Sequence, residues 1–131
     1  MEDGPLSSAA VISIVDDDDS VRAAMSSLIR SLGYLAYEFA SAEAFLASPR
    51  LQDTSCLIVD VQMPGMSGLD LQDALLARKP GLPVIVITAF PADGVRKRAE
   101  AAGAVGFFGK PVNGQSMIDC LDATLARGKR P

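Results

Sequence analysis

Histidine and tryptophan are absent from this 131-residue chain. Without histidine, no histidine-based catalytic triad and no histidine-ligated zinc site can form. The two cysteines, Cys56 and Cys120, are too few for a disulfide framework, and we expect both to be buried free thiols. No apolar run reaches the ~18–20 residues that a membrane-spanning helix needs. Residues 1–10 also lack the basic start and long apolar stretch of a secretory signal. We therefore expect a soluble, cytoplasmic protein without a membrane anchor.

Positive charge is in the minority, since 12 lysines and arginines stand against 16 acidic residues for a net charge of −4. Proteins that bind nucleic-acid backbones do so with clustered lysine and arginine. We therefore expect no direct nucleic-acid binding by this chain. Its short basic end, residues 127–131, is interpreted as a solvated tail.

The chain is long enough for one domain with a substantial core, because single domains typically contain ~100–150 residues and 49% of the residues here are hydrophobic. We expect a flexible leader over residues 1–10 and one domain over residues 11–126. No internal linker, sequence repeat or low-complexity block interrupts that domain.

Five short apolar runs alternate with five helical patterns. The runs have the composition of strands buried on both faces and lie at Val11–Val15, Leu35–Phe39, Cys56–Val59, Val84–Ile87 and Val105–Phe108. Helices are expected from Ser20 to Gly33, from Ser41 to before Pro49, over Leu69–Lys79, between Pro91 and Gly103, and over Gly114–Ala126, with Ser20 and Ser41 as N-caps. The alternation predicts an α/β fold, a parallel sheet with helices on both faces.

Reactive polar residues follow four of these strands. They are Asp16 and Asp17 after the first, Asp60 after the third, Thr88 after the fourth and Lys110 after the fifth. Because ligands bind at the carboxyl ends of the strands in open parallel sheets, we expect these side chains to meet at one rim.

This set of residues suits phosphoryl transfer. Carboxylates that lie close together repel one another, and Mg²⁺ relieves the repulsion because it prefers oxygen ligands. An ammonium and a hydroxyl can then stabilise a transferring phosphoryl group, for which positioning and electrostatics are decisive. Asp60 is the expected nucleophile and would form an acyl phosphate.

Four segments carry a family resemblance: Ile14–Asp18, Asp60–Gly68, Ile87–Ala89 and Gly103–Pro111. In this order and at these spacings they resemble two-component response-regulator receiver domains of the FixJ-like and CheY-like kind. The resemblance covers about Val11 to Leu125. It implies a flavodoxin-like (βα)₅ three-layer sandwich whose five parallel strands have the order 2-1-3-4-5.

The resemblance also implies roles for the metal-binding residues. Asp60 accepts the phosphoryl group and binds Mg²⁺ (or Mn²⁺). Asp17 binds the ion directly, and Asp16 does so directly or through water. Gln62 contributes its backbone carbonyl to the metal, so its side-chain identity matters little for that purpose. Because the chain has no histidine, the phosphohistidine donor must belong to a partner, a sensor histidine kinase or a histidine phosphotransfer domain.

Switching residues follow from the same resemblance. Thr88 and Lys110 contact the phosphoryl oxygens, the Lys110–Pro111 peptide is cis, and Phe107 swings inward when Thr88 moves toward the phosphate. The output surface would comprise the fourth helix, the fifth strand and the fifth helix. It would serve an unknown downstream protein, or a homodimer that depends on phosphorylation.

Some positions depart from the commonest family pattern. Gln62 and Phe90 occupy the places where the family tunes hydrolysis, and a bulky Phe90 would shield the acyl phosphate from water. Gly106 and Gly109 loosen the fifth strand, and Val112 replaces a frequent aromatic residue. These departures bear on the strength of the switch and on the lifetime of the phosphorylated form.

Three alternatives stay open at this point. The chain could be a receiver that acts by protein contact without phosphate, or an aspartyl-phosphate-type phosphatase, although it has no room for a cap insertion. It could stand alone or be cut from a longer regulator. Simpler interpretations also exist for single residues: Asp18 and Asp19 as a solvated helix start, and Phe107 as an ordinary core residue.

Overall fold

The computed structural model describes residues 9–128, with side chains as far as residue 126. Its five strands are all parallel and form one sheet in the order β2-β1-β3-β4-β5. Their bounds are Val11–Val15 (β1), Leu35–Phe39 (β2), Cys56–Asp60 (β3), Val84–Thr88 (β4) and Gly106–Gly109 (β5). The predicted flavodoxin-like strand order is therefore confirmed, and each strand lies within one residue of its expected position.

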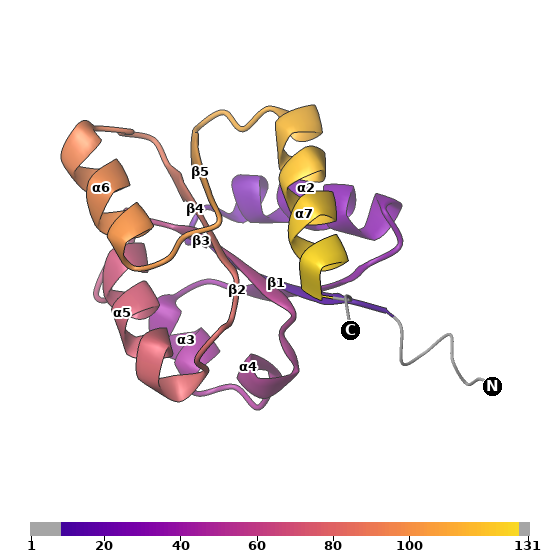
Figure 1. The fold of residues 1–131 in the computed structure, drawn as a ribbon, viewed down its shortest axis with the longest axis horizontal. Helices are drawn as coiled ribbons and strands as arrows, with labels where there is room; N and C mark the ends of the chain where they lie inside the picture. The colour runs from indigo at the N-terminus through magenta and orange to yellow at the C-terminus, as the bar shows by residue number, and fades with distance from the viewer. Residues whose placement is uncertain (1–8, 129–131) are drawn as a thin grey trace.

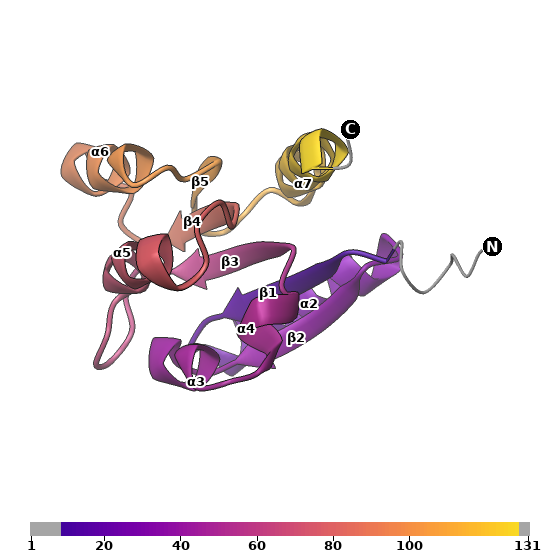
Figure 2. The ribbon, with the colours of Figure 1, turned by 60° about the horizontal axis from the view of Figure 1, so that its bottom comes forward.

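Helices connect successive strands and cover both faces of the sheet (Figures 1 and 2). Their bounds are Asp19–Ser31 (α2), Ala42–Leu46 (α3), Arg50–Asp53 (α4), Gly68–Arg78 (α5), Asp93–Ala101 (α6) and Gly114–Gly128 (α7). Residues of α2 and α7 join one buried cluster, and residues of α3, α4, α5 and α6 join the other. The result is a three-layer sandwich.

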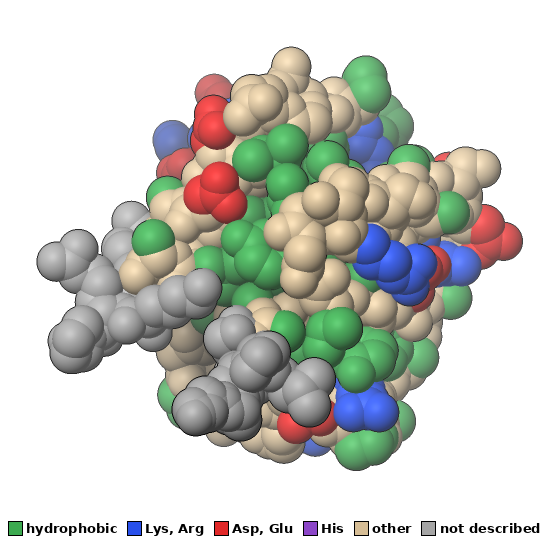
Figure 3. Space-filling view, turned by 90° about the vertical axis from the view of Figure 1, so that its right-hand side faces the viewer, with side chains coloured by type: hydrophobic (Ala, Val, Ile, Leu, Met, Phe, Trp, Pro, Cys, Tyr) green, Lys and Arg blue, Asp and Glu red, His purple; other side chains and the backbone are tan. Residues whose placement is uncertain are grey.

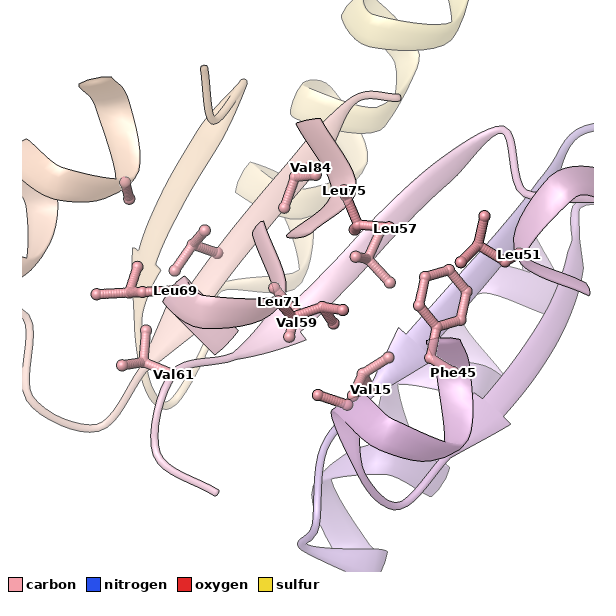
Figure 4. Packing of buried hydrophobic residues seen from close by; sticks show 13 residues of the cluster. Val15, Phe45, Leu51, Leu57, Val59, Val61, Leu69, Leu71, Leu75 and Val84 are labelled. Carbon is pink, nitrogen blue, oxygen red and sulfur yellow. The ribbon is translucent and has the colours of Figure 1, made fainter. Parts of the chain in front are cut away.

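The sheet divides the core into these two clusters because successive strand residues point to opposite faces. Ile58 in β3 packs with the α2 and α7 side, whereas its neighbours Leu57 and Val59 pack with the other side. Figure 4 shows the cluster on the side of α3, α4, α5 and α6, in which Phe45 and Leu51 lie over the sheet. Burial of each such side chain contributes about 1.5–3 kcal/mol, so both layers are fixed tightly against the strands.

Two local predictions need correction. The N-cap of α2 is Asp18 and not Ser20: its carboxylate accepts hydrogen bonds from the backbone N–H groups of Ser20 and Val21 at 2.9 and 3.0 Å. A carboxylate stabilises a helix start more strongly than a hydroxyl, through charge as well as hydrogen bonding. The short helix α4 was not foreseen, because four residues after Pro49 carry no helical periodicity. The Ser41 cap is confirmed, since its hydroxyl accepts from Ala44 N–H.

The ends of the domain differ slightly from expectation. Ala10, which was assigned to the leader, is buried, and its carbonyl accepts a hydrogen bond from Leu35 N–H at 2.9 Å. Residues 1–8 of the predicted leader and residues 129–131 of the predicted tail lie outside the described residues, and α7 extends to Gly128. Among residues 9–128, none of the helices is both long and apolar enough to cross a membrane. Cys56 is a buried free thiol as expected, while Cys120 is only partly buried.

Candidate functional site

Three carboxylates gather at the carboxyl end of the sheet. Asp16 and Asp17 directly follow β1, and Asp60 is the last residue of β3, the neighbouring strand. The register aligns Val15 with Val59, so the residues after them lie at the same height. One oxygen of each carboxylate lies within 4.8 Å of the others, with Asp16 and Asp60 buried and Asp17 exposed. The predicted convergence of these acids is therefore present in the structure.

Lys110 reaches into this cluster from the segment after β5. Its Nζ lies 3.1 Å from Asp16 Oδ2 and 3.3 Å from Asp60 Oδ1. Its backbone N–H donates to the Thr88 carbonyl at 2.8 Å, which fixes the start of this segment against β4. The Lys110–Pro111 peptide is cis, as predicted. The ammonium thus bridges the acids of β1 and β3 although its own strand lies at the edge of the sheet.

The pKa values reflect the crowding of charge. Burial raises the pKa of Asp60 from 3.8 to about 6, and the charge of Asp16 adds to this effect, while Lys110 opposes it. Burial acts to lower the pKa of Lys110, but contact with Asp16 and Asp60 outweighs it and leaves the net pKa raised. Lys110 therefore stays positively charged at neutral pH and does not fully offset the cost of the buried acids.

The donor set fits a hard divalent cation. Asp16 Oδ2 and Asp60 Oδ1 are buried, and apart from their ion pairs with Lys110 at 3.1 and 3.3 Å they have no hydrogen-bond partner within the described part of the chain. Buried charged oxygens that share one ammonium remain costly, and an Mg²⁺ ion would relieve this cost. The exposure of Asp17 leaves room for the waters that Mg²⁺ keeps. Gln62 lies two residues beyond Asp60 in an exposed loop.

The loop between β3 and α5 is held close to the acids by a glycine. A Cβ on Gly68 would lie 2.3 Å from the backbone oxygen of Asp60, which no side chain tolerates. Gly68 N–H donates to the Val61 carbonyl at 3.0 Å, and Met66 N–H donates to the Glu43 carboxylate at 3.0 Å. These contacts fix the loop that follows Asp60.

Thr88 ends β4 and is fully buried. Its hydroxyl donates to Gln62 Oε1 at 2.7 Å and accepts from Phe90 N–H at 3.0 Å. The sequence predicts no contact for the Gln62 side chain, because only the spacing of Gln62 from Asp60 is informative. Arg22 was missed too: its guanidinium donates to the Asp16 carbonyl at 2.6 Å and supports the β1–α2 loop.

The remaining candidates lie around this rim. Phe107 is partly buried against the cluster formed with α5 and α6, and the Arg96 guanidinium lies 4.6 Å from its ring centroid. Phe90 is 69% exposed, so its ring is free to cover the rim. Asp18 and Asp19 form the start of α2, in agreement with their simpler interpretation.

An apolar groove adjoins the rim between α2 and the segment from β5 to α7. Its volume is about 450 Å³, and its lining includes Val21, Ala24 and Leu28 of α2 and Lys110, Pro111 and Val112. Figure 3 views this side of the molecule and shows hydrophobic side chains gathered over it. Lys110 belongs both to the groove and to the acid cluster.

Comparison with known proteins agrees with this geometry. The family model of the response regulator receiver domain matches residues 12–122. The chain belongs to the response regulator receiver family. This confirms the resemblance drawn from the four sequence segments.

Individual relatives support the same assignment. The chain is 41% identical over 117 residues to the response regulator protein TodT of Pseudomonas putida, covering 89% of this chain and 52% of TodT. It is 36% identical over 116 residues to the transcriptional regulatory protein FixJ of Azorhizobium caulinodans, covering 88% and 55%. The crystal structure of a response regulator receiver protein from Pseudoalteromonas atlantica matches with a TM-score of 0.84 and 28% identity, covering 91% and 99%. The chain thus spans about half the length of these two curated relatives.

Proposed function

We propose that this receiver domain is a phosphorylation-dependent switch that takes a phosphoryl group on Asp60 from a partner's phosphohistidine. The observation that carries the proposal is the meeting of Asp60, Asp16, Asp17 and Lys110 at one rim, with Lys110 Nζ 3.3 Å from Asp60 Oδ1. A phosphohistidine-bearing partner of this kind would place the reaction in the cytoplasm.

The chemistry follows from the residues present. An Asp60 oxygen attacks phosphorus, the phosphorus–nitrogen bond to the donor imidazole breaks, and its electron pair leaves with that nitrogen. When bound, Mg²⁺ would offset negative charge on the phosphoryl oxygens and on the carboxylates that hold it. Lys110 provides a second positive charge for those oxygens, and Asp16, Asp17, Asp60 and the Gln62 carbonyl would hold the ion. After transfer, the hydroxyl of Thr88 could donate to a phosphoryl oxygen in place of Gln62 Oε1.

The groove beside Lys110 supports a docking place for the donor. A phosphohistidine must approach Asp60 within bonding distance, so its protein has to rest on a surface next to the rim. The groove lined by α2 and Pro111–Val112 is apolar and adjoins Lys110. We propose that an apolar helix face of the phosphohistidine-bearing partner occupies it.

Output would pass through α6, β5 and α7. A phosphoryl group adds about 1.5–2 negative charges, and Thr88 at the end of β4 is next to β5 in the sheet. Movement of Thr88 toward the new charge would leave space for Phe107, which comes from β5 and packs beside Arg96 of α6. The readout is then a changed surface for a downstream protein or a second copy.

Acetyl phosphate with Mg²⁺ tests the proposal. We expect intact-mass spectrometry to find one added phosphoryl group per chain, and none for Asp60→Asn. Asp73→Asn, an exposed acid in α5, is the matched control and should label like the wild type. Absence of labelling in the wild type would favour a receiver that acts without phosphate, and catalytic turnover of a generic phosphomonoester would favour a phosphatase.

A further inference from the structure

We propose that the Gln62 side chain is a positioning residue that restrains Thr88 in the unmodified domain, and that an acyl phosphate must displace it to engage the switch. The observation is the hydrogen bond from Thr88 Oγ1 to Gln62 Oε1 at 2.7 Å. This inference rests on the proposed function and adds a regulator of it.

Thr88 can donate only one proton, and two groups require it. A threonine hydroxyl has one hydrogen to donate. The Phe90 N–H already donates to Thr88 Oγ1 at 3.0 Å, so that contact leaves the hydroxyl proton to Gln62. A phosphoryl oxygen on Asp60 needs the same proton. The Gln62 amide and the phosphoryl group therefore compete for one donor.

The fold brings Asp60, Thr88 and Gln62 close to one another, so these groups can compete. Asp60 pairs with Ile87 across β3 and β4, so Thr88 is the next residue beyond the acceptor's level. Gln62 approaches from the loop after β3, which Gly68 and Glu43 hold in place. Thr88 itself is fully buried, and a buried hydroxyl without a partner would be costly. Gln62 thus provides the partner that lets Thr88 rest away from Asp60.

The strength of this restraint follows from hydrogen-bond energetics. A net intramolecular hydrogen bond is worth about 0.5–1.5 kcal/mol, which corresponds to a change of roughly 2–13-fold in an equilibrium constant. Gln62→Met removes the acceptor at nearly the same length and leaves the backbone carbonyl in place. We expect Gln62→Met to bind the phosphoryl mimic beryllofluoride, with saturating Mg²⁺, about 3–10-fold more tightly than the wild type.

The experiment is a double-mutant cycle on beryllofluoride affinity, read by NMR titration. Gln62→Met should have no effect in a Thr88→Val background, which lacks the proton at issue. The Phe90 amide resonance should move in unliganded Gln62→Met, because this N–H bonds to the Thr88 oxygen. Gln52→Met, an exposed glutamine in α4, is the control and should match the wild type.

The beryllofluoride affinities distinguish failure of this inference from failure of the proposed function. Equal affinity of Gln62→Met and wild type overturns the inference, as does an equal gain in the Thr88→Val background. Weaker binding by Gln62→Met would show that the amide assists the phosphorylated form and would also overturn it. Failure of beryllofluoride to bind the wild type at all would instead reject the proposed function.

Discussion

Burial of the Asp60 carboxyl costs the folded domain stability at neutral pH. The residue is 3% exposed, and among the described residues its Oδ1 has the ion pair with Lys110 at 3.3 Å but no hydrogen bond. Its raised pKa of about 6 means that the folded domain binds the Asp60 proton more tightly than the unfolded chain does. The stability that the protonated carboxyl contributes is fully present below pH 3.8. It is lost as the pH rises through about 6.

A substitution at this residue should therefore stabilise the metal-free domain. We expect Asp60→Asn to raise the free energy of unfolding at pH 7 by up to about 3 kcal/mol, from a shift of about two pKa units at 1.36 kcal/mol each. The gain should shrink between pH 6 and pH 4. Urea unfolding of both proteins with a chelator at several pH values measures it. The exposed control Asp73→Asn should change stability by less than ~1 kcal/mol; a pH-independent gain at Asp60 would contradict the account.

Lys110 should change the pKa of the Asp60 carboxyl in the direction opposite to burial. Its charge lowers the pKa of Asp60, so Lys110→Met should raise that pKa further. The chemical shift of the Asp60 carboxyl carbon, followed during a pH titration by NMR, reports this directly. Lys97→Met removes an exposed charge from α6 and serves as the control. An Asp60 titration that is unchanged in Lys110→Met would mean that the 3.3 Å contact is not present in solution.

At the scale of single residues, the sequence predicted which residues form the site better than it predicted which side chains contact one another. Asp16, Asp60 and Lys110 were predictable because strand ends converge in a parallel sheet. The bond between Gln62 and Thr88 was not, because it depends on how a loop turns back over the rim. The choice of Asp18 over Ser20 as N-cap also escaped prediction, since all four consecutive aspartates can cap a helix.

Among the elements, the β3–α5 connection is the one most tightly tied to the site. The backbone of Gly68 approaches the Asp60 carbonyl so closely that an added methyl group would lie 2.3 Å away. Helix α5 therefore starts against the backbone of Asp60, and any displacement of its first turn moves the loop that carries Gln62.

Gly68→Ala should be strongly destabilising for this reason. We expect a loss of about 2–4 kcal/mol, in the range of clashes and strain in well-packed sites, together with weaker beryllofluoride binding. Gly94→Ala is the matched control, because its Cβ would meet no atom within 4 Å in helix α6. That change should be neutral or stabilise by up to ~1 kcal/mol. Thermal unfolding distinguishes the two; equal stabilities would show that α5 can shift freely.

The strands and longer helices could be predicted to within about two residues, because each has a clear apolar run or stripe and a turn at its end. At helix α6 the difference reaches two residues, since the expected start is Pro91 and the helix begins at Asp93. Helix α4 was missed altogether. Its Leu51 is buried as a member of the core cluster that also contains residues of α3 and α5, so tertiary packing and not local pattern decides this helix.

For the whole molecule, the two faces of the sheet carry different surfaces. The apolar groove lies between α2 and the segment from β5 to α7 and reaches Lys110, while α6 covers the other face of the sheet (Figure 1). The surface proposed for phosphoryl delivery therefore shares α7 with the surface proposed for output, but its α2 side does not belong to the output surface. The α2 side is also separate from the acid cluster, so substitutions there should affect transfer from a protein without affecting the site's own chemistry.

Ala24→Glu tests that separation. Ala24 is exposed on α2 and lines the groove, so a carboxylate there would be desolvated by an apolar helix. We expect phosphotransfer from a histidine phosphotransfer partner to slow by at least about 10-fold, given ~1.4 kcal/mol per factor of ten. Labelling by acetyl phosphate should stay at the wild-type rate. A loss in both reactions would place the damage at the acceptor site, and a loss in neither would reject the groove as the docking place.

The most direct test of the central claim is a crystal structure of this domain with Mg²⁺ and beryllofluoride. We predict one ion bound to oxygens of Asp16 or its water, Asp17 and Asp60, with beryllium on an Asp60 oxygen and with Lys110 and Thr88 donating to fluorines. An ion bound elsewhere, or an Asp60 carboxylate that stays unmodified beside Lys110, would contradict the account.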